Sequence, residues 1–179
     1  MKSEKTILNE ISNLVEMNFL NKGKYKYFAH ILSEMMLDNE EIKIICLGKC
    51  NDKQQEVFCT NKRIFVLNNS IMPQTKVINI EKIDSLQIEN KGLFRRLHIV
   101  YGGTEFIIDN LTESQKFIST VNEQQDNYKS FKVEINKTVE KDILDKIEKL
   151  AELYKDGVLT EYEFSTKKME LLEQLKKGG

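Results

Sequence analysis

The stretch EVFCTNKRIFVL, residues 56–67, constrains the fold more than any other part of the chain. Two short apolar runs flank a polar break from Thr60 to Arg63, and their Val, Phe and Ile residues favour strands. A short polar break that contains Asn between two such runs predicts a β-hairpin. Because the runs are apolar at successive positions, we expect both faces of the hairpin to be covered. The pattern therefore predicts the central hairpin of a small closed sheet.

The residues on either side of this hairpin extend it into a larger sheet. Leu86 and Ile88 alternate with polar residues, as do Leu97 and Ile99, so each of these two strands should have one solvated face. The pair Gly102-Gly103 predicts a two-residue hairpin turn. The predicted strands cover about residues 42–50, 54–60, 63–68, 75–80, 83–90, 95–101 and 104–109.

Two amphipathic helices are predicted before the sheet. The first covers residues 4–20 and ends before the stop signal Gly23, and the second ends before Asp38. Their apolar stripes comprise Ile7, Leu8, Ile11, Leu14 and Val15 in the first helix, and Phe28, Ile31, Leu32, Met35 and Met36 in the second. We expect this helical hairpin to dock on the sheet, with a partner-binding groove or a dimer seam as the alternative.

A further helix is predicted after the last strand, where Thr112-x-x-Gln115 forms a capping box. Its apolar side, within residues 117–121, would close the open end of a strongly bent sheet. Residues 126–137 break the helical period and predict a linker, with a short extended piece at residues 131–133.

The last part of the chain predicts a second helical hairpin. Gly157 is the stop signal of its first helix, and Thr160-x-x-Glu163 is a capping box that opens the next. Such a hairpin is too small to bury its apolar stripes alone, so they should contact the body of the protein or a second copy. We assign this protein-interaction role to Ile143, Ile147, Leu150, Phe164, Met169 and Leu172.

The predicted fold class is α+β, a seven-stranded bent sheet or barrel that is capped by a C-terminal helix and has a helical hairpin at either end. The predicted parts are an N-terminal helical hairpin (1–39), a sheet domain (40–126), a linker (127–138) and a C-terminal helical hairpin (139–179).

Charge and cysteine content narrow the function classes. The chain has 27 basic and 28 acidic residues, whereas a dedicated nucleic-acid binder is usually clearly basic. Its three cysteines give no disulfide framework, and the charged start MKSEKTILNE lacks the apolar region of a signal peptide. No apolar run approaches the roughly 20 residues of a membrane span. We therefore expect a cytoplasmic protein whose electropositive sites are local patches.

Two segments resemble known bacterial domains. The run Cys59-Thr60-Asn61-Lys62-Arg63-Ile64-Phe65-Val66, with its T-x-x-R-apolar pattern, is similar to the pleckstrin-homology-like (PH-like) domains of the YokE-like group, over roughly residues 40–125. Supporting matches lie at residues 83–86, at residues 91–94 and in the last strand and helix through Val121.

The second resemblance lies in the tail. The leucine-containing run 143–153, followed by the pattern G-x-x-T-x-x-E-F at residues 157–164, resembles the short C-terminal domain called SHOCT. Together the resemblances imply a non-catalytic module whose tail serves oligomerisation or another interaction, and they bring no substrate, cofactor or catalytic residue. Residues 1–39 lie outside both.

Metal binding is the first candidate chemistry. Cys46 and Cys50 share one face of the first strand, and Cys59 lies on the second, so three thiols could join a histidine at zinc. However, the chain has no C-x-x-C pair, and His30 and His98 lack ligand-like spacing. Small buried hydrophobic residues are the favoured interpretation of the cysteines.

The turn from Asp156 to Glu163 echoes a calcium-binding loop. The leading Asp is missing, and Tyr154 stands where a carboxylate is needed. A helix stop and a capping box explain the same residues. With two unsupported histidines, no catalytic arrangement can be built either, so we predict no metal, no cofactor and no enzymatic activity.

Two basic stretches next to aromatic residues could contact an anionic membrane, at residues 22–28 (KGKYKYF) and 91–96 (KGLFRR). Each cation near such a surface contributes about 1 kcal/mol. In this alternative function, the side chains that bind lipid are Lys91, Leu93, Phe94, Arg95 and Arg96. Solvated turns explain the same residues, and the neutral total charge argues against nucleic acid stacking on Tyr25 or Tyr27.

Overall fold

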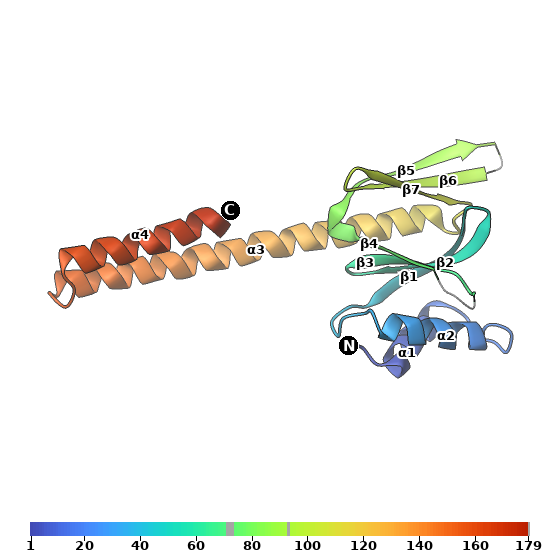
Figure 1. Ribbon diagram of the computed structural model, residues 1–179, viewed down its shortest axis with the longest axis horizontal. Coiled ribbons are helices and arrows are strands. Elements are labelled where there is room, and N and C mark those ends of the chain that lie inside the picture. The colour runs from blue at the N-terminus through green and yellow to red at the C-terminus, as the bar shows by residue number, and fades with distance from the viewer. Residues whose placement is uncertain (71–73, 93, 179) are drawn as a thin grey trace. The chain divides into compact units, whose positions relative to one another are not determined.

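The computed structural model describes residues 1–70, 74–92 and 94–178, except the side chains at positions 91, 177 and 178 (Figure 1). The chain forms two compact units, Met1–Gln125 and Asp126–Gly179. The first unit contains a sheet of seven antiparallel strands in the order β4-β3-β2-β1-β7-β6-β5. The second consists of helices.

All seven predicted strands are confirmed, each end within one residue of its predicted position. The predicted hairpin turn at Gly102-Gly103 is confirmed as well, because both glycines have positive φ and Tyr101 pairs with Thr104. The strands are β1 (Ile42–Cys50), β2 (Lys53–Thr60), β3 (Arg63–Leu67), β4 (Thr75–Asn79), β5 (Ile83–Lys91), β6 (Phe94–Tyr101) and β7 (Thr104–Asp109).

The β2–β3 hairpin is covered on both faces, as its apolar residues at successive positions predict. Val57 and Val66 pair across the strands and face a core that also contains Phe117 of helix α3. Phe58 and Phe65, the next pair, face a second core beneath the N-terminal helices. The hairpin therefore separates two cores.

The sheet bends where β1 meets β7. These strands pair at Lys49 and Asp109, and a Cβ on the neighbouring Gly48 would lie 2.4 Å from Ile108 Cγ2, so only glycine fits this close approach. The backbone N–H of Leu47 donates to Thr112 Oγ1 over 2.9 Å. The capping box predicted at Thr112 is therefore wrong: its hydroxyl bonds β1, and helix α3 begins at Ser114.

The N-terminal helices α1 (Glu4–Leu14) and α2 (Lys22–Ser33) pack on the sheet, which confirms the preferred interpretation of their stripes. Two details of the prediction are wrong. Helix α1 ends six residues earlier than residue 20, and Gly23 lies in the first turn of α2. The backbone is already extended at Val15, and the turn that follows is held by Asn18 Oδ1, which accepts hydrogen bonds from the backbone N–H groups of Leu20 and Asn21.

Helix α3 (Ser114–Lys155) contributes Phe117 and Val121 to the core, and Gln125 Nε2 donates to the carbonyls of Ile80 and Ile83 around the short 3₁₀ helix η1 (Ile80–Lys82). The predicted linker at residues 127–138 is helical in the structure. No Gly or Pro interrupts α3, so the break in apolar period marks an exposed helix rather than a change of conformation.

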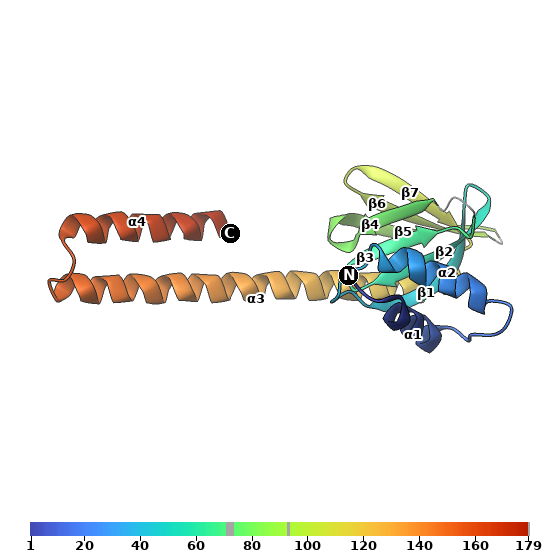
Figure 2. The same ribbon diagram turned by 60° about the horizontal axis from the view of Figure 1, so that its bottom comes forward.

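In the second unit, α3 and α4 (Glu161–Gly178) form an antiparallel hairpin (Figure 2). The turn confirms both predicted signals. Gly157 has φ of 71°, and the Val158 N–H donates to the Leu153 carbonyl, as in a Schellman motif. Thr160 and Glu163 form the reciprocal capping box, with the Thr160 N–H donating to Glu163 Oε2 over 2.9 Å.

Candidate functional site

The six tail residues assigned to protein interaction fall into two groups. Ile143 is 4% exposed, and Ile147, Leu150 and Phe164 are partly buried. The Phe164 ring stacks on Tyr154 with centroids 5.1 Å apart, so this apolar face includes contacts between the two helices of the hairpin itself. Met169 and Leu172 are exposed, at 60% and 39%. The outer surface of the hairpin therefore retains two of the six.

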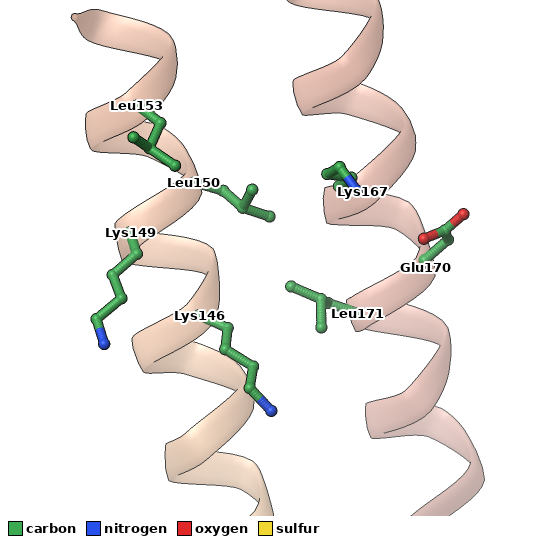
Figure 3. Close-up of a pocket in the computed structure, with 7 residues that line it drawn as sticks. All are labelled: Lys146, Lys149, Leu150, Leu153, Lys167, Glu170 and Leu171. Carbon is green, nitrogen blue, oxygen red and sulfur yellow. The ribbon is translucent and has the colours of Figure 1, made fainter. Parts of the chain in front are cut away.

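A shallow groove of about 300 Å³ lies between the two helices of this hairpin (Figure 3). Leu150, Leu153 and Leu171 line it, with Lys149 and Lys167 among the charged residues around them. Its remaining lining residues are Lys146, which pairs with Asp142 over 2.6 Å, and Glu170.

A second apolar surface lies on α3 where α4 does not reach. At 1.5 Å per residue, the 18 residues of α4 span about 27 Å, whereas residues 126–155 of α3 span about 45 Å. Phe131 and Ile135, at helical spacing in this uncovered segment, are 61% and 44% exposed. Val139 continues the same stripe. We call Phe131, Ile135 and Val139 the α3 stripe. Their helical spacing is visible in the sequence, but the sequence pattern predicts a linker at residues 127–138 and not one face of a helix.

The predicted lipid-binding residues lie at the β5–β6 turn. Leu93 is outside the described residues, as is the side chain of Lys91. Phe94 is 63% exposed, and Arg95 is exposed beside it. Arg96 Nε, in contrast, donates to Asp109 Oδ1 over 2.7 Å, and this bond raises the pKa of the guanidinium. The structure thus leaves Phe94 and Arg95 available and holds Arg96 against β7.

The turn between α1 and α2 exposes two large apolar side chains that the sequence interpretation placed in a helix. Phe19 is 96% exposed and Leu20 is 89% exposed. Asn18 and Asn21 hold the turn, because the Asn18 N–H donates to Asn21 Oδ1 over 2.8 Å and Asn21 Nδ2 donates to the Glu16 carbonyl over 2.9 Å. This surface lies outside the residues that carry the sequence resemblances.

The T-x-x-R pattern has a structural role. Thr60 Oγ1 donates to Glu40 Oε1 over 2.7 Å, and Arg63 forms an ion pair with the same fully buried carboxylate. Arg63 Nη2 also donates, over 2.7 Å, to the carbonyl of Met35, which lies just beyond the C-cap of α2. These contacts fix the β2–β3 turn to the segment that connects α2 with β1.

The cysteines and histidines do not gather into a metal site within the described parts of the chain. Burial raises the pKa of the Cys46 and Cys59 thiols to about 12, which keeps them protonated and unreactive. His98 Nδ1 lies 2.7 Å from Glu105 Oε1, and His30 Nδ1 lies 2.7 Å from Glu4 Oε1. Both histidines thus have local carboxylate partners.

Comparison with known proteins finds two family matches. The model for a bacterial PH domain matches residues 36–123, and the model for the short C-terminal domain matches residues 145–172. No curated protein matches the chain. None of the helices in the described part of the chain is long and apolar enough to cross a membrane.

Two of the solved structures that are similar to the chain come from Shewanella species. A pleckstrin-homology protein of the DUF1696 family from Shewanella loihica PV-4 is 15% identical, with a TM-score of 0.46, over 62% of this chain and 99% of that one. A pleckstrin homology domain from Shewanella amazonensis SB2B is 16% identical, with a TM-score of 0.45, over 55% of this chain and 96% of that one.

Proposed function

Since the chain carries a bacterial PH domain followed by a short C-terminal domain, we propose that it is a non-catalytic, cytoplasmic binding module that self-associates through the helices of its second unit. The observation that carries the proposal is the exposed α3 stripe, which continues beyond the end of α4. The three free cysteines support a reducing compartment.

The α3 stripe has the size that an assembly seam needs. Burying one Phe or Ile side chain contributes about 1.5–3 kcal/mol. A pair of chains that align their stripes would bury Phe131 and Ile135 twice, which offsets much of the roughly 4–15 kcal/mol cost of association. In the proposal, Ile143, Ile147, Leu150 and Phe164 keep the hairpin rigid, while Met169 and Leu172 extend its adhesive surface.

Light scattering on the full chain tests this proposal. We expect a particle mass that is a multiple of 20.9 kDa. The double variant Phe131→Ser/Ile135→Ser should raise the dissociation constant by at least ~100-fold, because two apolar side chains are lost from each protomer. At micromolar concentration it should therefore scatter as a monomer.

Val133→Ser is the matched control, because Val133 is also exposed on α3 but lies about 200° around the helix from Phe131. It should leave the mass unchanged. A wild-type monomer at all concentrations tested would refute self-association, and a mass that falls equally in the control would refute the assignment to the α3 stripe. If the wild type is monomeric, the remaining explanation of the exposed α3 stripe is docking of a different protein.

The second candidate function is peripheral binding to an anionic membrane, which the exposed Phe94 beside Arg95 favours. Sedimentation with acidic vesicles at low salt should retain the protein, and Arg95→Glu should release it. Lys82→Glu is the control, because it changes an exposed cation in η1, between β4 and β5 and away from the β5–β6 turn. The absence of sedimentation at low salt would remove this function.

A further inference from the structure

The α1–α2 turn presents Phe19 and Leu20 almost completely to solvent. Single exposed apolar residues are ordinary, but two large neighbours at 96% and 89% exposure form a protrusion that is costly in water. The turn is also held in place. Asn18 Oδ1 accepts from the N–H of Leu20 over 3.0 Å and from the N–H of Asn21 over 3.1 Å, and Asn18 and Asn21 bond each other. The protrusion is therefore preformed.

This turn lies at the same end of the first unit as two other turns (Figures 1 and 2). These are the β1–β2 turn and the β5–β6 turn, which lie at one end of the sheet because Asp109 of β7 is the register partner of both Lys49 and Arg96. Helix α2 reaches the same end, since Lys24 in its first turn forms an ion pair with Glu56 near the start of β2. Phe94, in the β5–β6 hairpin, thus lies on the same end as Phe19 and Leu20.

Cations concentrate at this end. Residues 15–27 contain three lysines and one glutamate, and residues 49–55 contain two lysines and one aspartate. Residues 94–96 contain two arginines and no acid. Two of these cations, Lys24 and Arg96, form ion pairs with Glu56 and Asp109. The three exposed apolar side chains are therefore accompanied by two exposed acids, Glu16 and Asp52, and by five further exposed cations, which are Lys22, Lys26, Lys49, Lys53 and Arg95. This combination fits a surface with negative charge above an apolar interior.

We propose that the α1–α2 turn inserts Phe19 and Leu20 into an anionic lipid bilayer, with Phe94 entering from the neighbouring turn. The inference rests on the second proposed function and adds the element that anchors it. A bilayer is favoured over nucleic acid, because stacking on bases would use Phe19 but leave Leu20 in water. It is favoured over a protein pocket by the spread of apolar side chains and cations across separate turns.

The chain contains no tryptophan, so Phe19→Trp provides a single fluorescent reporter in the full-length protein. Its emission should shift to shorter wavelength on addition of phosphatidylcholine vesicles that contain phosphatidylglycerol. Leu37→Trp, at an exposed site in the segment between α2 and β1, should not shift. Phe19→Ser/Leu20→Ser should lower the vesicle partition coefficient by at least ~10-fold, whereas Leu37→Ser should leave it unchanged.

Three results would overturn the inference, and they separate its failure from that of the proposed function. If the wild type does not bind acidic vesicles, both the proposed membrane function and insertion by the α1–α2 turn are refuted. If Arg95→Glu releases the protein while Phe19→Ser/Leu20→Ser does not, and the Phe19→Trp emission stays constant, the membrane function stands without insertion by this turn. If Phe19→Ser/Leu20→Ser no longer binds a single-stranded oligonucleotide but still binds vesicles, the turn is a nucleic-acid-binding element. The circular dichroism spectra of Phe19→Ser/Leu20→Ser and of Phe131→Ser/Ile135→Ser should match the spectrum of the wild type.

Discussion

At the scale of single residues, Glu40 and Glu56 are both buried, yet their surroundings move their pKa values in opposite directions. Burial alone would raise the pKa of Glu40, but hydrogen bonds from Arg63, Thr60 and the Leu37 N–H outweigh it and lower the pKa. Burial raises the pKa of Glu56, because its ion pair with Lys24 offsets only part of the cost and its Oε2 has no partner among the described residues.

Replacing Glu40 should destabilise the first unit strongly. Glu40→Ala leaves the Arg63 guanidinium without its carboxylate in a mostly buried site, which typically costs about 3–5 kcal/mol of unfolding free energy. Glu41→Ala, which removes an exposed pair with Lys43, should cost less than ~1 kcal/mol. Urea denaturation followed by circular dichroism measures both, and equal losses would contradict the role given to Glu40.

The pH dependence of stability should separate the two glutamates. A lowered pKa means that Glu40 stabilises the fold above the ordinary glutamate value of 4.5, and this contribution is lost as the pH falls below it. A raised pKa gives Glu56 the opposite sign, so its contribution is present below 4.5 and is lost as the pH rises through the folded-state value. Glu56→Gln should therefore gain stability relative to wild type between pH 4.5 and 7. The exposed control Glu81→Gln should keep a constant difference from wild type in urea midpoint across that pH range. A constant difference for Glu56→Gln would contradict the raised pKa assigned to Glu56.

At the scale of elements, turns set by local chemistry follow directly from the sequence. Gly102-Gly103, Gly157 and the Thr160–Glu163 box form as predicted, because each depends on residues within a few positions of one another. The prediction at Thr112 is wrong for the opposite reason. Its hydroxyl bonds the backbone of Leu47, 65 residues earlier in the chain, and no local pattern reveals that partner.

Two exposed glycines should respond to alanine with opposite signs. Gly157 has positive φ, so Gly157→Ala should destabilise the α3–α4 hairpin by roughly 1–2 kcal/mol, although a Cβ meets nothing within 4 Å. Gly23 lies in the first turn of α2 with equally open surroundings, so Gly23→Ala should stabilise by up to ~1 kcal/mol. Amide hydrogen exchange in α4 and in α2 reports the two effects; faster exchange in α2 of Gly23→Ala would contradict the second.

The candidate surfaces also include features that follow from local sequence and features that depend on packing. The spacing of the tail stripes is local, so the sequence identifies Ile143 and Phe164 as apolar-face residues, but only packing shows that α4 leaves Phe131 and Ile135 uncovered. Phe19 and Leu20 extend the apolar pattern of residues 7–15, which favours one long helix. Their exposure arises because α1 ends at Leu14 and the hydrogen bonds of Asn18 and Asn21 then hold both residues in a turn.

At the scale of the whole molecule, the two proposed activities use different forces on different units. The α3 stripe is apolar, so association through it is driven by the removal of hydrocarbon from water, which salt does not screen. The loop end of the first unit combines apolar side chains with five exposed cations that are not in the Lys24–Glu56 and Arg96–Asp109 ion pairs, so its attraction to an anionic surface depends on ionic strength. Salt should therefore distinguish them in a single protein.

Raising the ionic strength from about 0.1 M to about 1 M shortens the Debye length from about 10 Å to about 3 Å. We expect this change to release most wild-type protein from acidic vesicles in a sedimentation assay, while the mass measured by light scattering without vesicles stays constant or rises. Phe131→Ser/Ile135→Ser should be monomeric at both salt concentrations and still sediment with vesicles at low salt, since its loop end is intact. Disassembly by salt would contradict an apolar seam. Loss of vesicle binding by a monomeric Phe131→Ser/Ile135→Ser protein would show instead that the membrane contact requires the assembled form.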